Sequence, residues 1–203
     1  MQMDRNRLES ILAEFAVEFF RHPYICYNEH GLHAWLFCRI YQSLSLSERT
    51  GILGDQYVSI VQNEYPTAHD FGKSKRQNWD ISILKQPLEP LDDKSSKYDY
   101  LKLDAVIEMG LNAPENHLVE DIRRITHEKA NVSLKYILHF YRLSDGYSGR
   151  DLKPNHKGIM SREEAQIAIQ ETDVVVYYVM FDSTGKLENR VWEIRDTGIR
   201  KMG

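Results

Sequence analysis

The chain has 203 residues, of which 42% are hydrophobic and 28% charged, and its formal net charge at pH 7 is −4. This balance excludes a protein that coats nucleic acid through bulk positive charge, because such proteins are strongly basic. No run of about 18 apolar residues occurs, so we expect no transmembrane helix and no membrane partner. The N-terminal residues lack the apolar stretch of a signal peptide. The two cysteines, Cys26 and Cys38, are too few for a disulfide scaffold, and we expect reduced thiols in a cytoplasmic protein.

Two amphipathic helices are predicted at the N-terminal end of the chain. Apolar residues recur at helical spacing over Arg5–Arg21, and Pro23 follows the predicted helix. Asn28 is a suitable N-cap for a second helix, whose apolar stripe runs from Leu32 to Leu44.

The rest of the chain alternates between strand-like and helix-like patterns. Strands are predicted, in chain order, at Tyr57–Glu64, Trp79–Leu84, Leu101–Met109, Val132–Leu143, Asp173–Phe181 and Arg190–Arg195. Helices are predicted at Leu118–His127 and over a short segment that Ser161 and Glu164 would begin as a capping box. This alternation predicts a mixed β-sheet flanked by helices, in an α/β or α+β fold.

We expect a single domain over residues 1–203, with a helical lead-in at residues 1–50 and an α/β core at residues 55–203. The polar stretch from Lys85 to Tyr100 contains two prolines and is interpreted as a connection between strands. The apolar strand at Asp173–Phe181 fits either the core or a homodimer interface, and its pattern does not separate the two.

Acidic residues occur within or next to the predicted strands. Asp80 lies in the second strand, and Glu108 lies near the carboxyl end of the third. A carboxylate inside an apolar strand is costly to bury unless it is paired or binds a cation. Glu64 ends the first strand and Glu29 lies in the first turn of the second helix, so the four acids would complete a cluster suited to a hard cation such as Mg²⁺. The alternative is that the strand acids face water and that Glu29 is a first-turn acid favoured by the helix dipole.

In their order and spacing, these residues resemble the PD-(D/E)XK nuclease superfamily, whose fold is called restriction-endonuclease-like. The resemblance covers about Asn28 to Tyr141. It is carried by Glu29, Glu64-Tyr65-Pro66-Thr67, Trp79-Asp80-Ile81-Ser82-Ile83-Leu84, Ala105-Val106-Ile107-Glu108-Met109-Gly110 and Asp121-Ile122-Arg123-Arg124. It implies hydrolysis of phosphodiester bonds in nucleic acid, with Asp80 and Glu108 as ligands of Mg²⁺ or Mn²⁺ and with Glu29 or Glu64 as a supporting acid.

One motif position departs from that family. Its third motif is an acid, any residue and then usually a lysine, whereas this chain has Glu108-Met109-Gly110. The family's lysine is thought to orient or activate the attacking water. The resemblance therefore leaves two functions open, an endonuclease that uses another lysine and a catalytically degenerate module that binds nucleic acid or protein. The candidate substitutes are Lys75, Lys85 and Lys102, of which Lys102 is expected near the other end of the sheet.

Three basic segments are candidates for holding a phosphate backbone. Lys73, Lys75 and Arg76 come shortly before Asp80 and are the predicted nucleic-acid-binding residues. The others are Arg123 with Arg124, and Lys153 with His156 and Lys157. Each segment also has an ordinary interpretation as solvated surface.

Histidine residues are scattered through the chain. His30 and His33 are three residues apart on a predicted helix, which is a spacing that some metal sites use. No matching pair of cysteines or histidines follows, so we predict no structural zinc site and interpret the histidines as core or surface residues.

Overall fold

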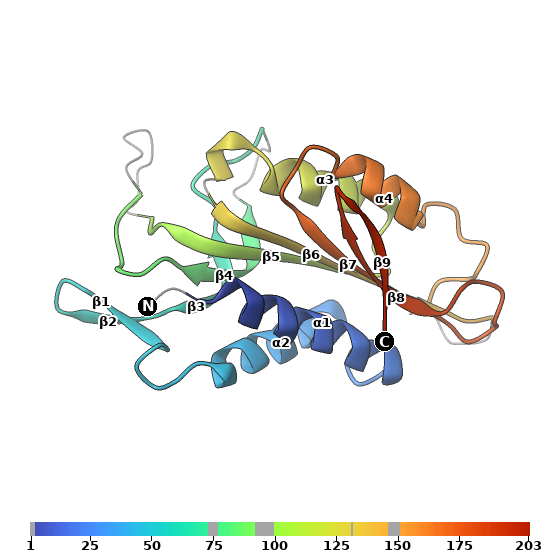
Figure 1. The fold of residues 1–203 in the computed structure, drawn as a ribbon, viewed down its shortest axis with the longest axis horizontal. Coiled ribbons are helices and arrows are strands. Elements are labelled where there is room, and N and C mark those ends of the chain that lie inside the picture. Colours follow the sequence, from blue (N-terminus) through green and yellow to red (C-terminus); the bar gives the residue numbers. More distant parts are fainter. Residues whose placement is uncertain (1–2, 73–76, 92–99, 131, 146–150) are drawn as a thin grey trace.

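A mixed β-sheet forms the centre of the fold, and helices cover both of its faces (Figure 1). In a computed structural model of the chain, residues 3–72, 77–91, 100–130, 132–145 and 151–203 are described. The sheet has the strand order β3-β4-β5-β6-β7-β8-β9. The strands are β3 (Val61–Pro66), β4 (Asn78–Leu84), β5 (Leu103–Leu111), β6 (Val132–Leu143), β7 (Val175–Asp182), β8 (Arg190–Arg195) and β9 (Gly198–Met202).

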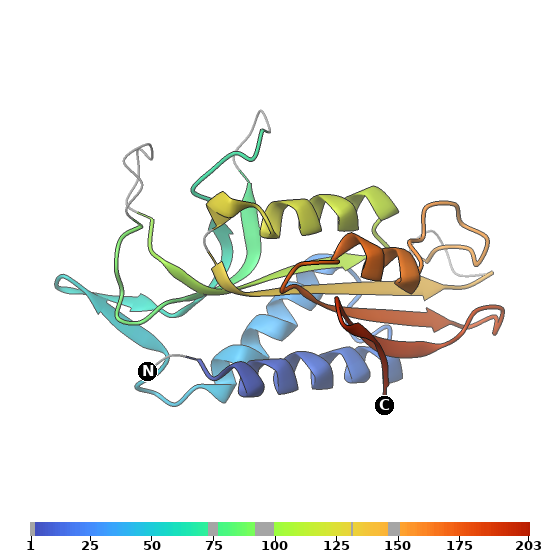
Figure 2. The same ribbon diagram turned by 45° about the horizontal axis from the view of Figure 1, so that its top comes forward.

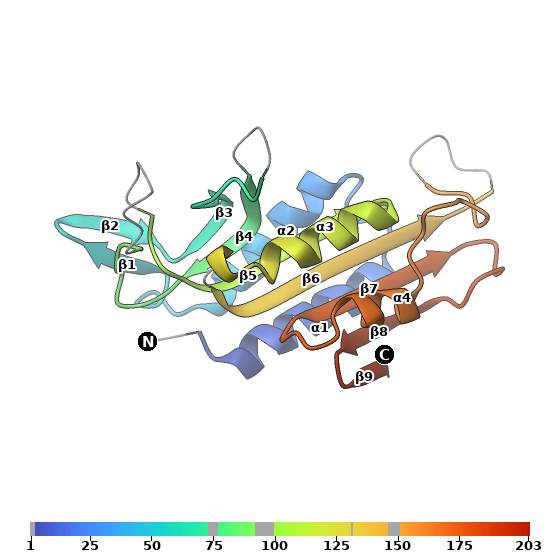
Figure 3. The same cartoon turned by 90° about the horizontal axis from the view of Figure 1, so that it is seen from above.

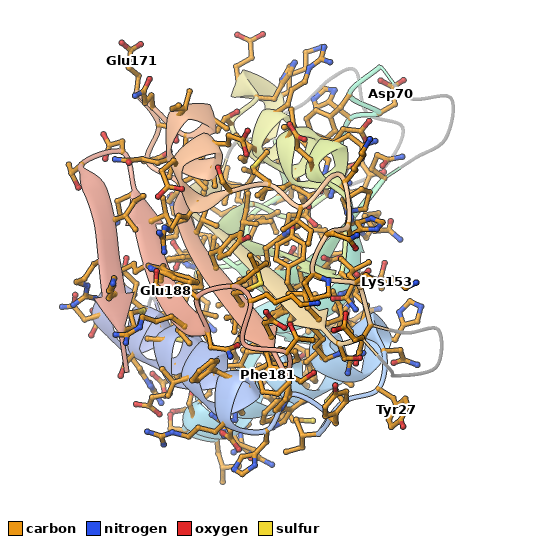
Figure 4. All side chains as sticks on the ribbon, turned by 90° about the vertical axis from the view of Figure 1, so that its right-hand side faces the viewer. Tyr27, Asp70, Lys153, Glu171, Phe181 and Glu188 are labelled. Atoms are coloured by element: carbon orange, nitrogen blue, oxygen red, sulfur yellow. The ribbon has the colours of Figure 1, made fainter. Side chains whose placement is uncertain are left out.

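Helices α1 (Arg5–Arg21) and α2 (Glu29–Ser43) lie on one face of the sheet, and α3 (Glu115–Ile125) and α4 (Arg162–Ala168) lie on the other (Figure 2). Strands β5, β6 and β7 are parallel to one another, and every other pair of neighbouring strands in this sheet is antiparallel. The fold is therefore a mixed α/β arrangement, as the alternation of elements predicts. Figure 4 shows the two helical layers with the strands between them, with Asp70 on the α3 side and Tyr27 on the α1–α2 side.

Helix α2 begins at its predicted cap, Asn28, and helix α1 begins at a cap that was not predicted, Asp4. The side chain of Asp4 accepts a hydrogen bond from the backbone N–H of Asn6, and that of Asn28 accepts one from Gly31. Such caps satisfy N–H groups that have no partner within the helix. The apolar stripe of α1 is buried against the sheet, so its helical spacing follows from the face that it covers.

Strands β5 and β6 are buried along almost their whole length because helices cover both faces of the parallel part of the sheet. Their near-continuous apolar sequences follow from this burial. The buried residues of all the layers form one hydrophobic cluster. None of the helices in the described part of the chain combines the length and apolar character needed to span a membrane.

The structure corrects the predicted strand at Tyr57–Glu64. That segment divides at Ile60 into β2 (Gln56–Ser59) and β3, because the chain changes partner there from β1 (Thr50–Leu53) to β4. Gly54 and Asp55 form the two-residue turn of the β1–β2 hairpin, in which Gly54 has φ +63°. This hairpin projects beyond the main sheet (Figure 3).

Other boundaries differ by smaller amounts. Strand β6 and helix α1 have the predicted bounds, and the capping box of Ser161 and Glu164 begins α4 as predicted. Strand β5 begins two residues later than predicted because Leu101 forms only an isolated bridge to Pro90. Strand β9 was not predicted, since its half-exposed residues lack a clear alternation. A short 3₁₀ helix at Glu128–Ala130 connects α3 to β6.

Candidate active site

Strands β4 and β5 separate at the end of the sheet where each carries an acid. Their antiparallel register stops at Ile81, one residue short of Asp80. Instead, the backbone N–H of Met109 donates a hydrogen bond of 2.7 Å to Oδ2 of Asp80. Two residues further along β5, the N–H of Leu111 donates one of 2.9 Å to Oε2 of Glu29. The carboxylates of Asp80 and Glu29 thus accept the hydrogen bonds that a neighbouring strand would otherwise accept from β5. These bonds hold both side chains at the open end of the sheet.

Glu108 lies on β5 beside this opening and is only 1% exposed. Its Oε1 accepts a hydrogen bond of 2.6 Å from Nη2 of Arg124 on α3, and the same nitrogen lies 3.2 Å from Oδ1 of Asp121. The guanidinium also lies over the ring of Trp79 and donates to Gln77. Arg124 therefore has a well-defined place between the two carboxylates.

Burial and mutual repulsion make the buried carboxyl groups of this cluster harder to ionise. Burial raises the pKa of Glu108 well above its ordinary value, and the charge of Asp80 and a hydrogen bond between the two side chains raise it further, against the opposing effect of Arg124. Burial likewise raises the pKa of Asp80, and Glu29 and Glu64 add to this effect while His33 opposes it. Perturbed carboxyl groups of this kind are frequent where a protein binds a cation or carries out acid–base chemistry.

His33 links two of the predicted acids. This side chain is buried on α2, with Nε2 3.7 Å from Oδ2 of Asp80 and Nδ1 3.7 Å from Oε1 of Glu64. Glu64 has φ +55°, a conformation that residues other than glycine adopt rarely and at some cost. His30 joins His33 and Glu64 in a group whose possible ligand atoms lie within 4.8 Å of one another. The structure therefore brings Glu29, Glu64, Asp80 and Glu108 to one end of the sheet, together with His33, which the sequence did not single out as part of this site.

Gly110 stands where the resembling family usually has a lysine, and the structure accounts for it. The residue pairs in register with His139 of β6, and a Cβ on Gly110 would lie 2.5 Å from Nε2 of His139. The imidazole therefore occupies the space that any side chain at this position would need. Burial, with a smaller effect from His117, lowers the pKa of His139 to about 3, so its ring is neutral at pH 7.

The described candidates for a substitute lysine lie away from the acids. Nζ of Lys102 donates a hydrogen bond of 2.7 Å to Glu89, and the backbone N–H of Lys85 donates to the carbonyl of Lys102. Lys102 precedes Glu108 by six residues on an extended chain, which corresponds to about 20 Å. Lys75 lies outside the described residues, as do the other predicted nucleic-acid-binding residues, Lys73 and Arg76.

A pocket of about 200 Å³ opens beside α3, next to the acid cluster. Arg124 and Asp121 line this pocket and also contact or face Glu108, so they connect the pocket with the cluster. The other lining residues are Phe71, Gln77, His117, Glu120, Arg123 and His127. Arg123 and Arg124 thus place positive charge on the wall of a pocket that Glu120 and Asp121 also line. No family model, curated protein or solved structure matches this chain.

Proposed function

We propose that the protein hydrolyses phosphodiester bonds of nucleic acid with the help of Mg²⁺ or Mn²⁺. The observation that carries this proposal is the convergence of Asp80 and Glu108 at the open end of the sheet, where Asp80 accepts a hydrogen bond from Met109 and its charge raises the pKa of the buried Glu108. Two acids that converge in this way fit one hard cation, which proteins hold through one or two carboxylates while leaving positions for water and phosphate.

The order of the elements around the site agrees with the resemblance to PD-(D/E)XK nucleases. The helix with Glu29, the strand with Glu64, the strands with Asp80 and Glu108 and the helix with Asp121 follow one another along the chain and surround one end of the sheet. This agreement supports the proposal because the residues that carry the resemblance come from separate elements and still meet at one place.

Each side chain of the site has a separate role in the proposed hydrolysis. Asp80 and Glu108 would hold the cation, which when bound polarises a phosphoryl oxygen and lowers the pKa of its water. Glu29 positions the end of β5 through the N–H of Leu111. Arg124 faces both Glu108 and the pocket, so its guanidinium is placed to neutralise a phosphate that enters there. His33 lies next to Asp80 and is the imidazole placed to accept a proton from an attacking water.

A second candidate function rests on two observations about the same residues. Gly110 supplies no lysine, and Arg124 already occupies Oε1 of Glu108 at 2.6 Å. Both favour a catalytically degenerate module that retains the fold and binds nucleic acid or protein. Free thiols at Cys26 and Cys38 support the cytoplasm as the compartment for either function.

The test is a cleavage assay with single- and double-stranded DNA and RNA, in Mg²⁺, in Mn²⁺ and in excess chelator. Asp80→Asn and Glu108→Gln should abolish cutting, because each removes a carboxylate from the cation site. Glu89→Gln is the matched control, since Glu89 is an exposed acid that pairs with Lys102. A folded wild-type protein that cuts none of these substrates would contradict the hydrolase and favour the binding module.

A further inference from the structure

A second group of metal-ligating side chains lies on the α3 side of the sheet. His117 and Asp121 are four residues apart on α3 and therefore share one face of the helix, and His139 reaches them from β6. One possible ligand atom from each lies within 4.8 Å of the other two. Nε2 of His117 and Oδ2 of Asp121 are 3.5 Å apart, close to the about 3.4 Å that separates two ligands of a tetrahedral ion with bonds of about 2.1 Å.

The atoms that face one another in this group lack other partners. Oδ2 of Asp121 and both ring nitrogens of His139 are buried without a hydrogen bond in the described part of the chain. His139 is 0% exposed and Asp121 is 2% exposed, so bulk solvent does not reach these atoms. Because buried polar atoms are nearly always paired, an unpartnered carboxylate oxygen beside an unpartnered imidazole indicates a missing ligand.

The surrounding residues hold the group in position. Nη2 of Arg124 lies 3.2 Å from Oδ1 of Asp121, which leaves Oδ2 directed at His117. The absence of a side chain at Gly110 provides the space for the ring of His139. In metal sites, residues that contact the ligands without binding the metal orient those ligands. The glycine that departs from the nuclease motif is therefore required for this arrangement.

The site also has an entrance. The side chain of His117 is 39% exposed, and together with Asp121 it lines the pocket of about 200 Å³. An ion can therefore reach the three side chains from solvent, and the pocket leaves room for a further ligand such as water. A set of three protein ligands with one open position is typical of catalytic zinc sites, whereas structural sites are closed by four.

We propose that His117, Asp121 and His139 together bind one Zn²⁺ ion. Two imidazoles and one carboxylate favour zinc over Mg²⁺, which prefers oxygen ligands alone. The site is separate from the Asp80–Glu108 pair and does not depend on the proposed hydrolase activity. Arg124 joins the two sites, since it contacts Glu108 and Asp121 with the same nitrogen.

The experiment is calorimetric titration of tag-free, chelator-treated full-length protein with Zn²⁺, together with the visible absorption of its Co²⁺ form. We expect one equivalent of zinc to bind. Replacing a residue that only orients a metal ligand weakens metal binding by about 10–100-fold. His117→Gln and Asp121→Asn remove ligands themselves, so each should weaken zinc binding at least as much. His127→Gln is the matched control, because His127 lines the same pocket but does not belong to the group.

His117→Gln is the decisive variant, because His117 is partly exposed and its replacement leaves the core intact, whereas His139 is fully buried. Circular dichroism should show that this variant is folded. Zinc binding that is absent in the wild type, or equal in His117→Gln and the wild type, would overturn the proposal, as would binding that only Asp80→Asn removes. Since Asp80→Asn should keep the zinc and lose cleavage, a failure of this proposal is distinguishable from a failure of the hydrolase.

Discussion

Gly110 and His139 share one position in the sheet, where the imidazole of one residue fills the space that a side chain of the other would need. We expect Gly110→Ala to lower the free energy of unfolding by roughly 1–3 kcal/mol, the range for overpacking a well-filled core. Urea unfolding measures this change. In a His139→Ala background the same substitution should cost much less, because the atom that the new Cβ meets is absent.

Gly31→Ala is the matched control for this prediction. A Cβ on Gly31 would lie 3.3 Å from Oδ1 of Asn28, a side-chain atom that has to move only slightly, and alanine favours the helix, so the change in stability should be much smaller than at Gly110. Equal losses in the two alanine variants would mean that the contact with His139 is not the cause.

Arg124 compensates a carboxylate that would otherwise be buried without a partner. Its side chain is 16% exposed and that of Glu108 is 1% exposed. We expect Arg124→Met to destabilise the metal-free protein by about 3 kcal/mol, the lower end of the range for breaking a buried pair, because the guanidinium retains some contact with water. Added Mg²⁺ should restore part of this loss if Asp80 and Glu108 bind it, and thermal unfolding with and without the ion measures both effects.

Lys135→Met provides the comparison with an exposed pair. Lys135 bonds to Asp173, whose side chain is 58% exposed, and pairs at such surfaces contribute only about 0–1 kcal/mol. A variant Arg124→Met that is no less stable than Lys135→Met would show that Glu108 does not depend on the guanidinium.

Acid should weaken the contact between α1 and the sheet through Glu9. Burial opposes ionisation of this side chain, but hydrogen bonds from Arg5 and Arg195 lower its pKa below the ordinary value of 4.5. The unfolded chain therefore takes up this proton at a higher pH than the folded one. The stabilisation is present above about pH 4.5 and is lost as the pH falls through the lowered pKa of the folded state.

Glu9→Gln should remove this part of the pH dependence. We expect its unfolding free energy to fall less steeply than that of the wild type between about pH 6 and about pH 3, as measured by urea unfolding. Glu163→Gln is the control, because the Glu163 side chain is 61% exposed and its pair with the neighbouring Arg162 contributes little at such a surface. Parallel curves for Glu9→Gln and the wild type would contradict the prediction.

Local sequence patterns predicted most of the helices and strands because each depends on its own residues. The stripe of α1 and the capping box of α4 have signatures a few residues long. The boundary at Ile60 and the edge strand β9 have no such signature. They are set by which distant strand each segment pairs with, and a single sequence does not reveal this pairing.

In the candidate active site, too, some residues have a local sequence signature and others are brought together only by the pairing of strands. The four acids were predictable because carboxylates stand out in strands and at a helix N-terminus, and all four lie at one end of the sheet. His139 was not predictable as a neighbour of Gly110, since only the parallel register of β5 and β6 brings them together. His117 and Asp121 had the helical spacing of a pair of ligands, but that signal acquires meaning only when a third ligand is known.

The last prediction separates positioning from cation binding at Glu29. Oε2 of Glu29 accepts a hydrogen bond from the N–H of Leu111, and this contact holds the end of β5 next to Asp80. The amide oxygen of glutamine accepts the same bond, whereas alanine leaves the N–H without a partner. If the role is positioning, Glu29→Gln should therefore retain cleavage within about tenfold of the wild type, and Glu29→Ala should lose much more, because small misplacements at a site cost about 100-fold. Steady-state cleavage rates at saturating Mg²⁺ measure the difference. If Glu29 binds the cation instead, Glu29→Gln will lose as much activity as Asp80→Asn, because both variants remove a negative charge from the ion.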